Sequence, residues 1–228
     1  MFAPLTLDDP FTLFIVTLAG ILIVGYLIGR AMNRRRARTI SAWLEPGMRT
    51  LGGTPLVQAV NRTAFRVKVT QARAPFSVVT ASAVLLSREV LPIWLWERIH
   101  RNSDLVFFHL TLRQPPRIGV EIVDLGRELG RRGKAQADRL GWPLAARQGA
   151  YHLYGPDGHI SDPHTDALLA HIAGARYTPH RVAIRPHAPH VLASFTFSEI
   201  QPFSSTDVMR WMTQLVRLIP LSEEGKSA

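Results

Sequence analysis

The chain contains no cysteine and very little lysine. Without cysteine it cannot form disulfides, thiolate zinc sites, iron–sulfur clusters or a cysteine nucleophile. The only lysines are Lys68, Lys134 and Lys226, so arginine supplies nearly all of the positive charge. The sequence also lacks a Gly-x-Ser-x-Gly elbow and a glycine-rich phosphate loop, which are typical of hydrolases and nucleotide-binding enzymes. We therefore expect no enzymatic activity and no cofactor.

Charge is absent from a long run near the N-terminus. Between Asp9 and Arg30 the chain reads PFTLFIVTLAGILIVGYLIG, with no acidic or basic residue. At about 1.5 Å per residue, about 20 helical residues reach about 30 Å, the thickness of the hydrocarbon core of a bilayer. The alternative is a buried helix of a soluble domain, which seldom stays uncharged for so long. We predict a transmembrane helix over residues 11–29, preceded by a short extracytoplasmic segment over residues 1–10.

The charges that flank this run predict its orientation. Asp8 and Asp9 precede it, and five arginines follow it closely: Arg30, Arg34, Arg35, Arg36 and Arg38. Positive residues beside a membrane helix favour the cytoplasmic side. We therefore expect the helix to cross a cell inner membrane, with the N-terminus outside and the C-terminal domain in the cytoplasm. A cleaved secretory signal has the opposite polarity. The same arginines could bind anionic lipid headgroups, each contributing about 1 kcal/mol near the surface.

The composition of the whole chain favours a folded and basic protein. The hydrophobic fraction of 46% is ample for a core, and 27 basic against 17 acidic residues give a formal net charge of +10. Such an excess favours polyanionic partners, either ribosomal RNA or lipid headgroups. A second basic cluster forms the candidate polyanion surface: Arg127, Arg131, Arg132, Lys134 and Arg139. Ordinary solubility is the alternative reading. Aromatic residues are not interleaved with these charges, and we expect no DNA partner.

The remaining pattern predicts one α+β domain. Residues 30–53 are expected to form a basic juxtamembrane helical connector, residues 54–221 a cytoplasmic domain, and residues 222–228 a disordered tail. Alternation and turn residues predict strands over 65–70, 77–86, 105–113, 118–124, 150–154, 181–185 and 191–198. Helices are predicted over 89–100, 126–140, 163–173 and 205–219.

Two features of this order bear on the architecture. The strands over 105–113 and 118–124 flank two prolines and suggest a hairpin. The order strand–helix–strand–strand–helix occurs twice along the chain. Together these features predict a mainly antiparallel sheet with helices on one face. The repeated order is compatible with a duplicated β-α-β-β-α unit.

An apolar helix is expected around LPIWLWERI, which contains Trp94 and Trp96. Six large apolar residues in nine cannot all point to one side of a helix. If one side packs on the sheet, the other either meets a second element of the core or lies exposed. An exposed patch would face the membrane or a client helix.

Histidines and acidic residues in the second half invite a metal hypothesis. His164 and His171 are seven residues apart on a predicted helix, too far for one chelating pair. The loop GPDGHISDPHTD contains Asp157, Asp162 and Asp166, but its spacing is not that of an EF-hand. A turn followed by a helix cap explains the same acidic residues. We therefore expect no metal site.

Several stretches of the chain resemble the calumin family of the endoplasmic reticulum membrane. These stretches are GYLIGRAMNRRRARTISAWLEPGMRTL, VLPIWLWERIHRNSDLVFFHLTL, PRIGVEIVDLGRELGRRG, and VLASFTFSEI with the terminal helix. The family has an outside N-terminus, one membrane helix, a basic junction with an Ala-Trp pair and a cytosolic α+β domain. Here Ala42 and Trp43 match that pair. The family's long acidic luminal segment and its C-terminal coiled coil have no counterpart.

The resemblance implies a role beside the translocon. Calumin and a small partner assist multipass membrane proteins during insertion, so the expected partners are the bilayer, a translocase, a small membrane protein and the ribosome. Calcium binding does not carry over, because the acidic segment is missing. Ribosome contact would have to use the basic helix. A membrane-tethered domain that binds a lipid or a small molecule is the alternative function, and the sequence does not indicate an oligomeric state.

Overall fold

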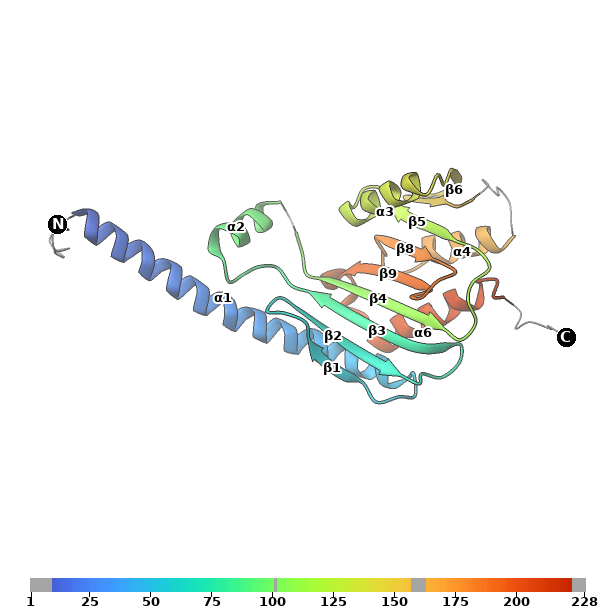
Figure 1. Ribbon diagram of the computed structural model, residues 1–228, viewed down its shortest axis with the longest axis horizontal. Helices are drawn as coiled ribbons and strands as arrows, with labels where there is room; N and C mark the ends of the chain where they lie inside the picture. Colours follow the sequence, from blue (N-terminus) through green and yellow to red (C-terminus); the bar gives the residue numbers. More distant parts are fainter. Residues whose placement is uncertain (1–9, 101, 157–162, 223–228) are drawn as a thin grey trace.

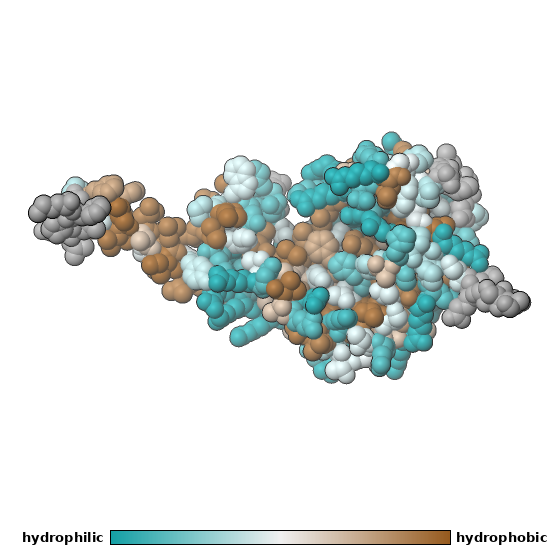
Figure 2. Space-filling model, viewed as in Figure 1, coloured by the Kyte–Doolittle hydropathy of each residue, from teal (hydrophilic) through white to brown (hydrophobic). Residues whose placement is uncertain are grey.

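The computed structural model describes residues 10–100, 102–156 and 163–222 of the chain. Helix α1 (Pro10–Arg49) projects from the domain as a stalk with the N-terminus at its far end (Figure 1). In the described part of the chain, α1 is the one helix that is long and apolar enough to cross a membrane. Only 11% of its most apolar 18-residue window is buried, unlike the core helix of a soluble protein. On the face seen in Figure 2, the outer part of this stalk is largely apolar.

The predicted membrane helix and connector form one uninterrupted helix that ends on the domain. Pro46 has no N–H and so cannot bond to the carbonyl oxygen of Ala42, but it lies in the last turn of α1, and the helix continues to Arg49. The N–H of Gly47 donates to Ser205 Oγ at 2.9 Å. A Cβ atom at Gly47 would lie 2.5 Å from the carbonyl oxygen of Ser205, so only glycine permits this approach. The inner end of α1 is therefore packed against the start of α6.

A nine-stranded sheet forms the centre of the domain, and every strand pair is antiparallel. Its order is β1-β2-β3-β4-β9-β8-β5-β7-β6. The strands are β1 (Leu56–Ala59), β2 (Ala64–Thr70), β3 (Phe76–Val84), β4 (Leu105–Leu112), β5 (Val120–Asp124), β6 (Leu144–Gln148), β7 (Tyr151–Tyr154), β8 (Arg181–Ile184) and β9 (Val191–Thr196). The predicted α+β class with a mainly antiparallel sheet is thus confirmed.

The helices divide between the two faces of the sheet. The inner half of α1, α4 (Pro163–Ala173) and α6 (Ser205–Arg217) pack on one face and form the main core with the alternate apolar residues of the strands. Helix α3 (Glu128–Arg139) packs on β5 and β8 from the opposite face, where Val123 and Ala137 form a second small cluster. The prediction that the helices lie on one face of the sheet is therefore correct for α1, α4 and α6, and α3 is the exception. The remaining helices are α2 (Leu91–Ile99) and α5 (Phe197–Ile200).

The predicted hairpin between residues 105–113 and 118–124 is wrong. Strand β4 pairs with β3 and β9, and β5 pairs with β7 and β8, so two strands lie between β4 and β5. The prolines at 115 and 116 begin a crossing connection, which is tied to the C-terminal segment by an isolated bridge between Pro116 and Leu221. Local turn residues do not distinguish a hairpin from such a connection.

The sequence reading missed β1 and β6, and the repeated order of elements is not a repeated pairing. In the first repeat of the order, β3 pairs directly with β4. The corresponding strands of the second repeat, β7 and β8, do not pair with each other, because β5 lies between them. Strands β1 and β6 are the two short edges of the sheet. Strand β1 is largely exposed and β6 is only half-buried, so neither carries an alternating apolar pattern. The predicted N-terminal segment up to Asp9, the acidic residues Asp157 and Asp162, and the tail after Ser222 lie outside the described residues.

Candidate functional site

Two glycines on the apolar half of α1 hold α2 and the segment before it. A Cβ atom at Gly29 would lie 1.9 Å from the carbonyl oxygen of Arg88, and one at Gly25 would lie 2.2 Å from the side chain of Leu91. The pattern Gly25-x-x-x-Gly29 is the small-residue spacing that lets membrane helices approach other backbones closely. Sequence reasoning treated these glycines as part of an undivided span. The spacing was the signal that could have indicated a docking site.

We expect Gly29→Ala to loosen this junction, because the backbone of Arg88 cannot move aside as a flexible side chain can. The cost should be about 1–3 kcal/mol, the usual range for overpacking. Hydrogen exchange of residues 86–91, measured by mass spectrometry in detergent micelles, should become faster. Gly20→Ala is the matched control, since nothing lies within 4 Å of its added Cβ. Equal exchange in the two variants would contradict the assigned contact.

A buried ion-pair network next to this junction joins α1 to the domain. The carboxylate of Asp104 accepts hydrogen bonds from Arg36 Nε at 2.8 Å and from both terminal nitrogens of Arg88 at 3.0 Å. It also accepts the backbone N–H of Leu86, and Asn33 of α1 bonds Arg88 and the carbonyl of Leu86. The side chain of Asp104 is 3% exposed. The network fixes the direction in which α1 leaves the domain.

An apolar groove of about 510 Å³ lies between α1 and α2. It is lined by Thr17, Gly20, Ile21, Val24, Gly25, Ile28, Gly29, Met32, Arg88, Leu91 and Trp94. The groove begins within the apolar run of α1 and ends at the ion-pair network. Its small residues leave room beside the helix backbone, and its larger ones are apolar except for Arg88 at the inner end. This composition suits another apolar chain, such as a transmembrane segment or a lipid tail.

The tryptophans predicted as a candidate client patch have different environments. Trp94 is half-buried and lines the groove. Trp96 is 64% exposed and its ring lies on His100, with 4.0 Å between the ring centroids. No residue of α2 is fully buried. Trp96 is therefore exposed and Trp94 lies beside α1, and α2 does not pack as a core helix.

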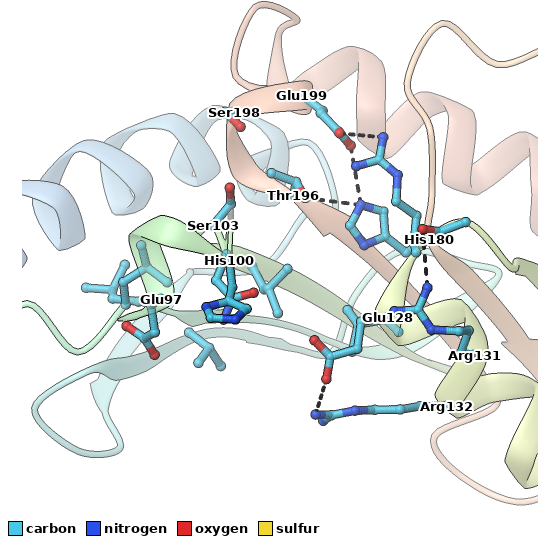
Figure 3. Close-up of a pocket in the computed structure, with 18 residues that line it drawn as sticks. Glu97, His100, Ser103, Glu128, Arg131, Arg132, His180, Thr196, Ser198 and Glu199 are labelled. Atoms are coloured by element: carbon cyan, nitrogen blue, oxygen red, sulfur yellow. Dashed lines mark hydrogen bonds and ion pairs between the residues drawn. The ribbon is translucent and has the colours of Figure 1, made fainter. Parts of the chain in front are cut away.

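A polar cleft of about 470 Å³ opens on the other side of α2, between this helix, the start of α3 and the ends of β4 and β9 (Figure 3). The labelled residues that line it are Glu97, His100, Ser103, Glu128, Arg131, Arg132, His180, Thr196, Ser198 and Glu199. Its charged groups are largely paired inside the protein. Arg127 donates to Glu199 at 2.8 Å, and Arg132 pairs with Glu128. The cleft is therefore polar but not strongly cationic.

His180 is the most buried titratable group of this cleft. Burial lowers the pKa of its imidazole, and Arg127 lowers it further, while the nearby Glu199 carboxylate opposes this change. Its Nε2 lies 3.1 Å from Thr196 Oγ1 and 3.4 Å from Glu199 Oε2. Because both partners meet the same ring nitrogen, the histidine does not bridge them as the base of a nucleophile–base–acid relay does. This arrangement supports a structural role.

The predicted membrane-contact arginines separate into two groups. Arg30, Arg34, Arg35 and Arg38 are exposed on α1. Arg36 instead faces the domain, where it pairs with Asp104 and lies over the ring of Phe197 at 4.7 Å from its centroid. Its assignment to the lipid-contact group is therefore corrected, because its guanidinium forms an ion pair with Asp104 inside the protein.

The basic residues near α3 do lie together at one surface, but three of them have carboxylate partners. Arg127 pairs with Asp124 and Glu199, Arg132 with Glu128, and Lys134 with Asp138. Arg131 donates to the carbonyl oxygens of Leu125 and Gly126, and Arg139 is exposed. These pairs reduce the net positive charge that the surface offers to a polyanion.

The histidines serve packing and hydrogen bonding where the structure describes them. His171 stacks on Trp211, and His190 Nδ1 accepts the backbone N–H of Leu112 at 2.9 Å. Within residues 10–100, 102–156 and 163–222, no three His, Asp or Glu side chains gather in a way that could hold a metal ion.

No protein-family profile matches the chain, and no curated protein matches it at a significant level. The resemblance to the calumin family accordingly stays a prediction that depends on the sequence stretches quoted for it.

Proposed function

We propose that this protein is a membrane-anchored, non-enzymatic factor that assists the insertion or folding of multipass membrane proteins. In this proposal α1 spans a cell inner membrane with its N-terminus outside, and the α+β domain lies in the cytoplasm. The exposed apolar half of α1 supports the span, because side chains such as Phe14 and Ile23 are more than half exposed and have no core to join. The exposed arginines after it support the orientation.

The observation that carries the client hypothesis is the groove between α1 and α2. It starts at Thr17 and Gly20, within the stretch that would lie in lipid, and it is almost wholly apolar. An incoming transmembrane segment could lie along α1 at Gly20 and meet Trp94 at the inner end. Packing next to small residues is a common way for membrane helices to associate. The groove thus offers a place for a helix that has left the translocase but has not yet found its own partners.

Contact with a ribosome or translocase is the second part of the proposal. The exposed arginines of α1 and the surface at Arg131 and Arg139 would meet phosphates or acidic protein surfaces. Since several charges of α3 are already paired, this contact should be weak and sensitive to salt. It would recruit the protein, whereas the groove would act on the client. A small membrane protein could occupy the same groove between clients.

Photocrosslinking tests the client hypothesis directly. A photoreactive amino acid at Ile21, which lines the groove, should crosslink to nascent multipass proteins more strongly than the same group at Ile23. Ile23 is a matched control, because it is also exposed on α1 but does not line the groove. A nascent secreted protein should give little product at either position. Crosslinking of equal strength at the two positions, or none at either, would reject the groove as a client site.

The polar cleft favours a second candidate function, a membrane-tethered domain that binds a lipid headgroup or a small molecule. Its volume of about 470 Å³ lies within the range of small-ligand sites. Native mass spectrometry of the purified full chain should then detect a bound species. Its mass should disappear when Ser103 and Ser198, which line the cleft, are both replaced with leucine.

A further inference from the structure

Helix α2 presents an apolar face that nothing in the described protein covers. Its half-buried residues are Leu91, Trp94 and Glu97, one in every three, and these face α1 and the domain. The other side carries Ile93, Leu95, Trp96 and Ile99, whose exposed fractions are 48%, 55%, 64% and 67%. A helix that buries none of its four apolar side chains on this side would be costly in water. Its sequence therefore requires a partner that the domain itself does not provide.

The height of α2 along α1 indicates what that partner is. Leu91 contacts Gly25, which lies five residues before Arg30, the first charge after the apolar run. Five helical residues correspond to about 7–8 Å along the axis. Helices that lie in the membrane interface insert by about 5–10 Å. The start of α2 is thus at the depth of an interfacial helix, if residues 11–29 of α1 occupy the hydrocarbon core.

Residues near the start of α2 support the same depth for the interface between lipid tails and headgroups. Tyr26 of α1 meets Arg62 from the turn between β1 and β2, with 3.4 Å between the phenol oxygen and the guanidinium. Tyrosine and tryptophan rings concentrate at the boundary between lipid tails and headgroups, and arginines beside them meet phosphates. Arg98 is exposed on α2, and Arg30, Arg34 and Arg35 are exposed on α1. The acidic residue of α2, Glu97, is turned inward and accepts the backbone N–H of Ser87 at 2.9 Å.

We propose that α2 is a second membrane contact, an interfacial helix half-inserted into the cytoplasmic leaflet beside α1 and bordered by anionic headgroups. The face of Ile93, Trp96 and Ile99 continues the apolar surface of α1 across the groove, so the same lipid can cover both. The contacts at Gly25 and Gly29 and the Asp104 network hold α2 at this level. With two membrane contacts, the whole protein cannot turn freely about the axis of α1 in the membrane, and the polar cleft lies at the membrane surface. This inference depends on the proposed span of α1.

Spin-label depth measurements test the inference, and the absence of native cysteine makes single labels simple. The full chain would be reconstituted in vesicles of phosphatidylcholine and phosphatidylglycerol. Labels would replace Trp96 and Ile99 on α2, Leu18 in the centre of the α1 run, and Arg139 on the exposed end of α3. Collision rates with oxygen, which dissolves in lipid, and with a soluble nickel complex report the depth of each label. We expect labels at 96 and 99 to favour oxygen severalfold more than the label at 139.

The reference positions separate failure of this inference from failure of the proposed span. If the label at 18 is in lipid while those at 96 and 99 are as accessible to nickel as that at 139, α2 is not a membrane contact. If the label at 18 is also in water, the span itself is wrong. Labels at 96 and 99 that neither reagent reaches would mean that protein covers α2, which overturns the lipid assignment.

A charge variant gives an independent measurement. With the label at Ile93, the double substitution Trp96→Glu and Ile99→Glu should move the label towards the aqueous collision ratio, because carboxylates oppose insertion next to anionic lipids. Both side chains are exposed, so the substitutions should leave the fold of the domain intact. Arg139→Glu is the control that adds negative charge elsewhere, and it should leave the label at 93 unchanged. An unchanged ratio in the double variant would overturn the inference.

Discussion

Asp104→Ala should destabilise the protein by about 3–5 kcal/mol, the cost of removing one partner from a buried ion pair. The substitution leaves the guanidinium of Arg88, which is 14% exposed, and that of Arg36 beside a vacated acceptor. It also leaves the N–H of Leu86 without its side-chain acceptor. Because the network joins α1 to the domain, α1 should lose its fixed direction before the sheet unfolds. Denaturant unfolding in micelles, followed by tryptophan fluorescence, measures the change.

Two controls separate the buried network from ion pairs in general. Glu45→Ala removes a carboxylate that pairs with Arg49 on the exposed side of α1, and it should cost no more than about 0.5 kcal/mol. Asp104→Asn keeps an acceptor for Leu86 but removes the charge, so its cost should lie between the other two. Equal losses for Asp104→Ala and Glu45→Ala would show that the network does not stabilise the protein.

The same network has a pH signature. Burial on its own raises the pKa of Asp104, but hydrogen bonds from Arg88, from the Leu86 N–H and from Arg36 outweigh it, so the pKa lies below its usual value. A lowered pKa means that the carboxylate stabilises the folded state fully above the unfolded value of about 4. This contribution is lost as the pH falls through the lower folded value. The free energy of unfolding of Asp104→Asn, measured as a function of pH, should lack this acid-dependent loss.

The sequence predicted the elements of this fold better than their arrangement. The alternation over residues 65–70 predicts a strand because its apolar side chains all face one core. The pairing of β4 with β9 joins residues more than 80 positions apart, and no local pattern records which strands become neighbours. The helix around α3 was predicted, but its position on the opposite face was not. That position depends on Gly133, whose Cβ would meet Val123 and Arg181.

The candidate site shows the same limit. A cluster of arginines after an apolar run predicts a membrane junction, yet within that cluster only Arg36 points inward. Its partner Asp104 is 68 residues away along the chain, so the sequence could not single it out. The exposed side of α2 was one of two alternatives that helical spacing left open. What decided between them was Gly25-x-x-x-Gly29, which brings α2 to the apolar half of α1 and away from the core.

Leu18→Arg combined with Leu22→Arg should release the protein from the membrane. Both leucines lie near the middle of the apolar run, and each arginine at the centre of a membrane helix costs about 2.5–3.5 kcal/mol of insertion. The combined cost of at least about 5 kcal/mol corresponds to more than about three powers of ten in the insertion equilibrium. Alkaline carbonate should therefore extract the variant from vesicles, whereas the unmodified chain should stay in the pellet.

The two positions suit this test because the variant should lose its anchor without losing its fold. Leu18 and Leu22 are 44% and 46% exposed, and neither belongs to the buried core of the domain. The matched control places the same two charges at Thr39 and Ala42, exposed positions of α1 beyond the arginine cluster. This control should remain in the membrane fraction. If the Leu18→Arg/Leu22→Arg chain resists carbonate as the control does, lipid is not the solvent of the apolar run. Its exposed leucines, isoleucines and phenylalanines would then have to be covered by another protein chain.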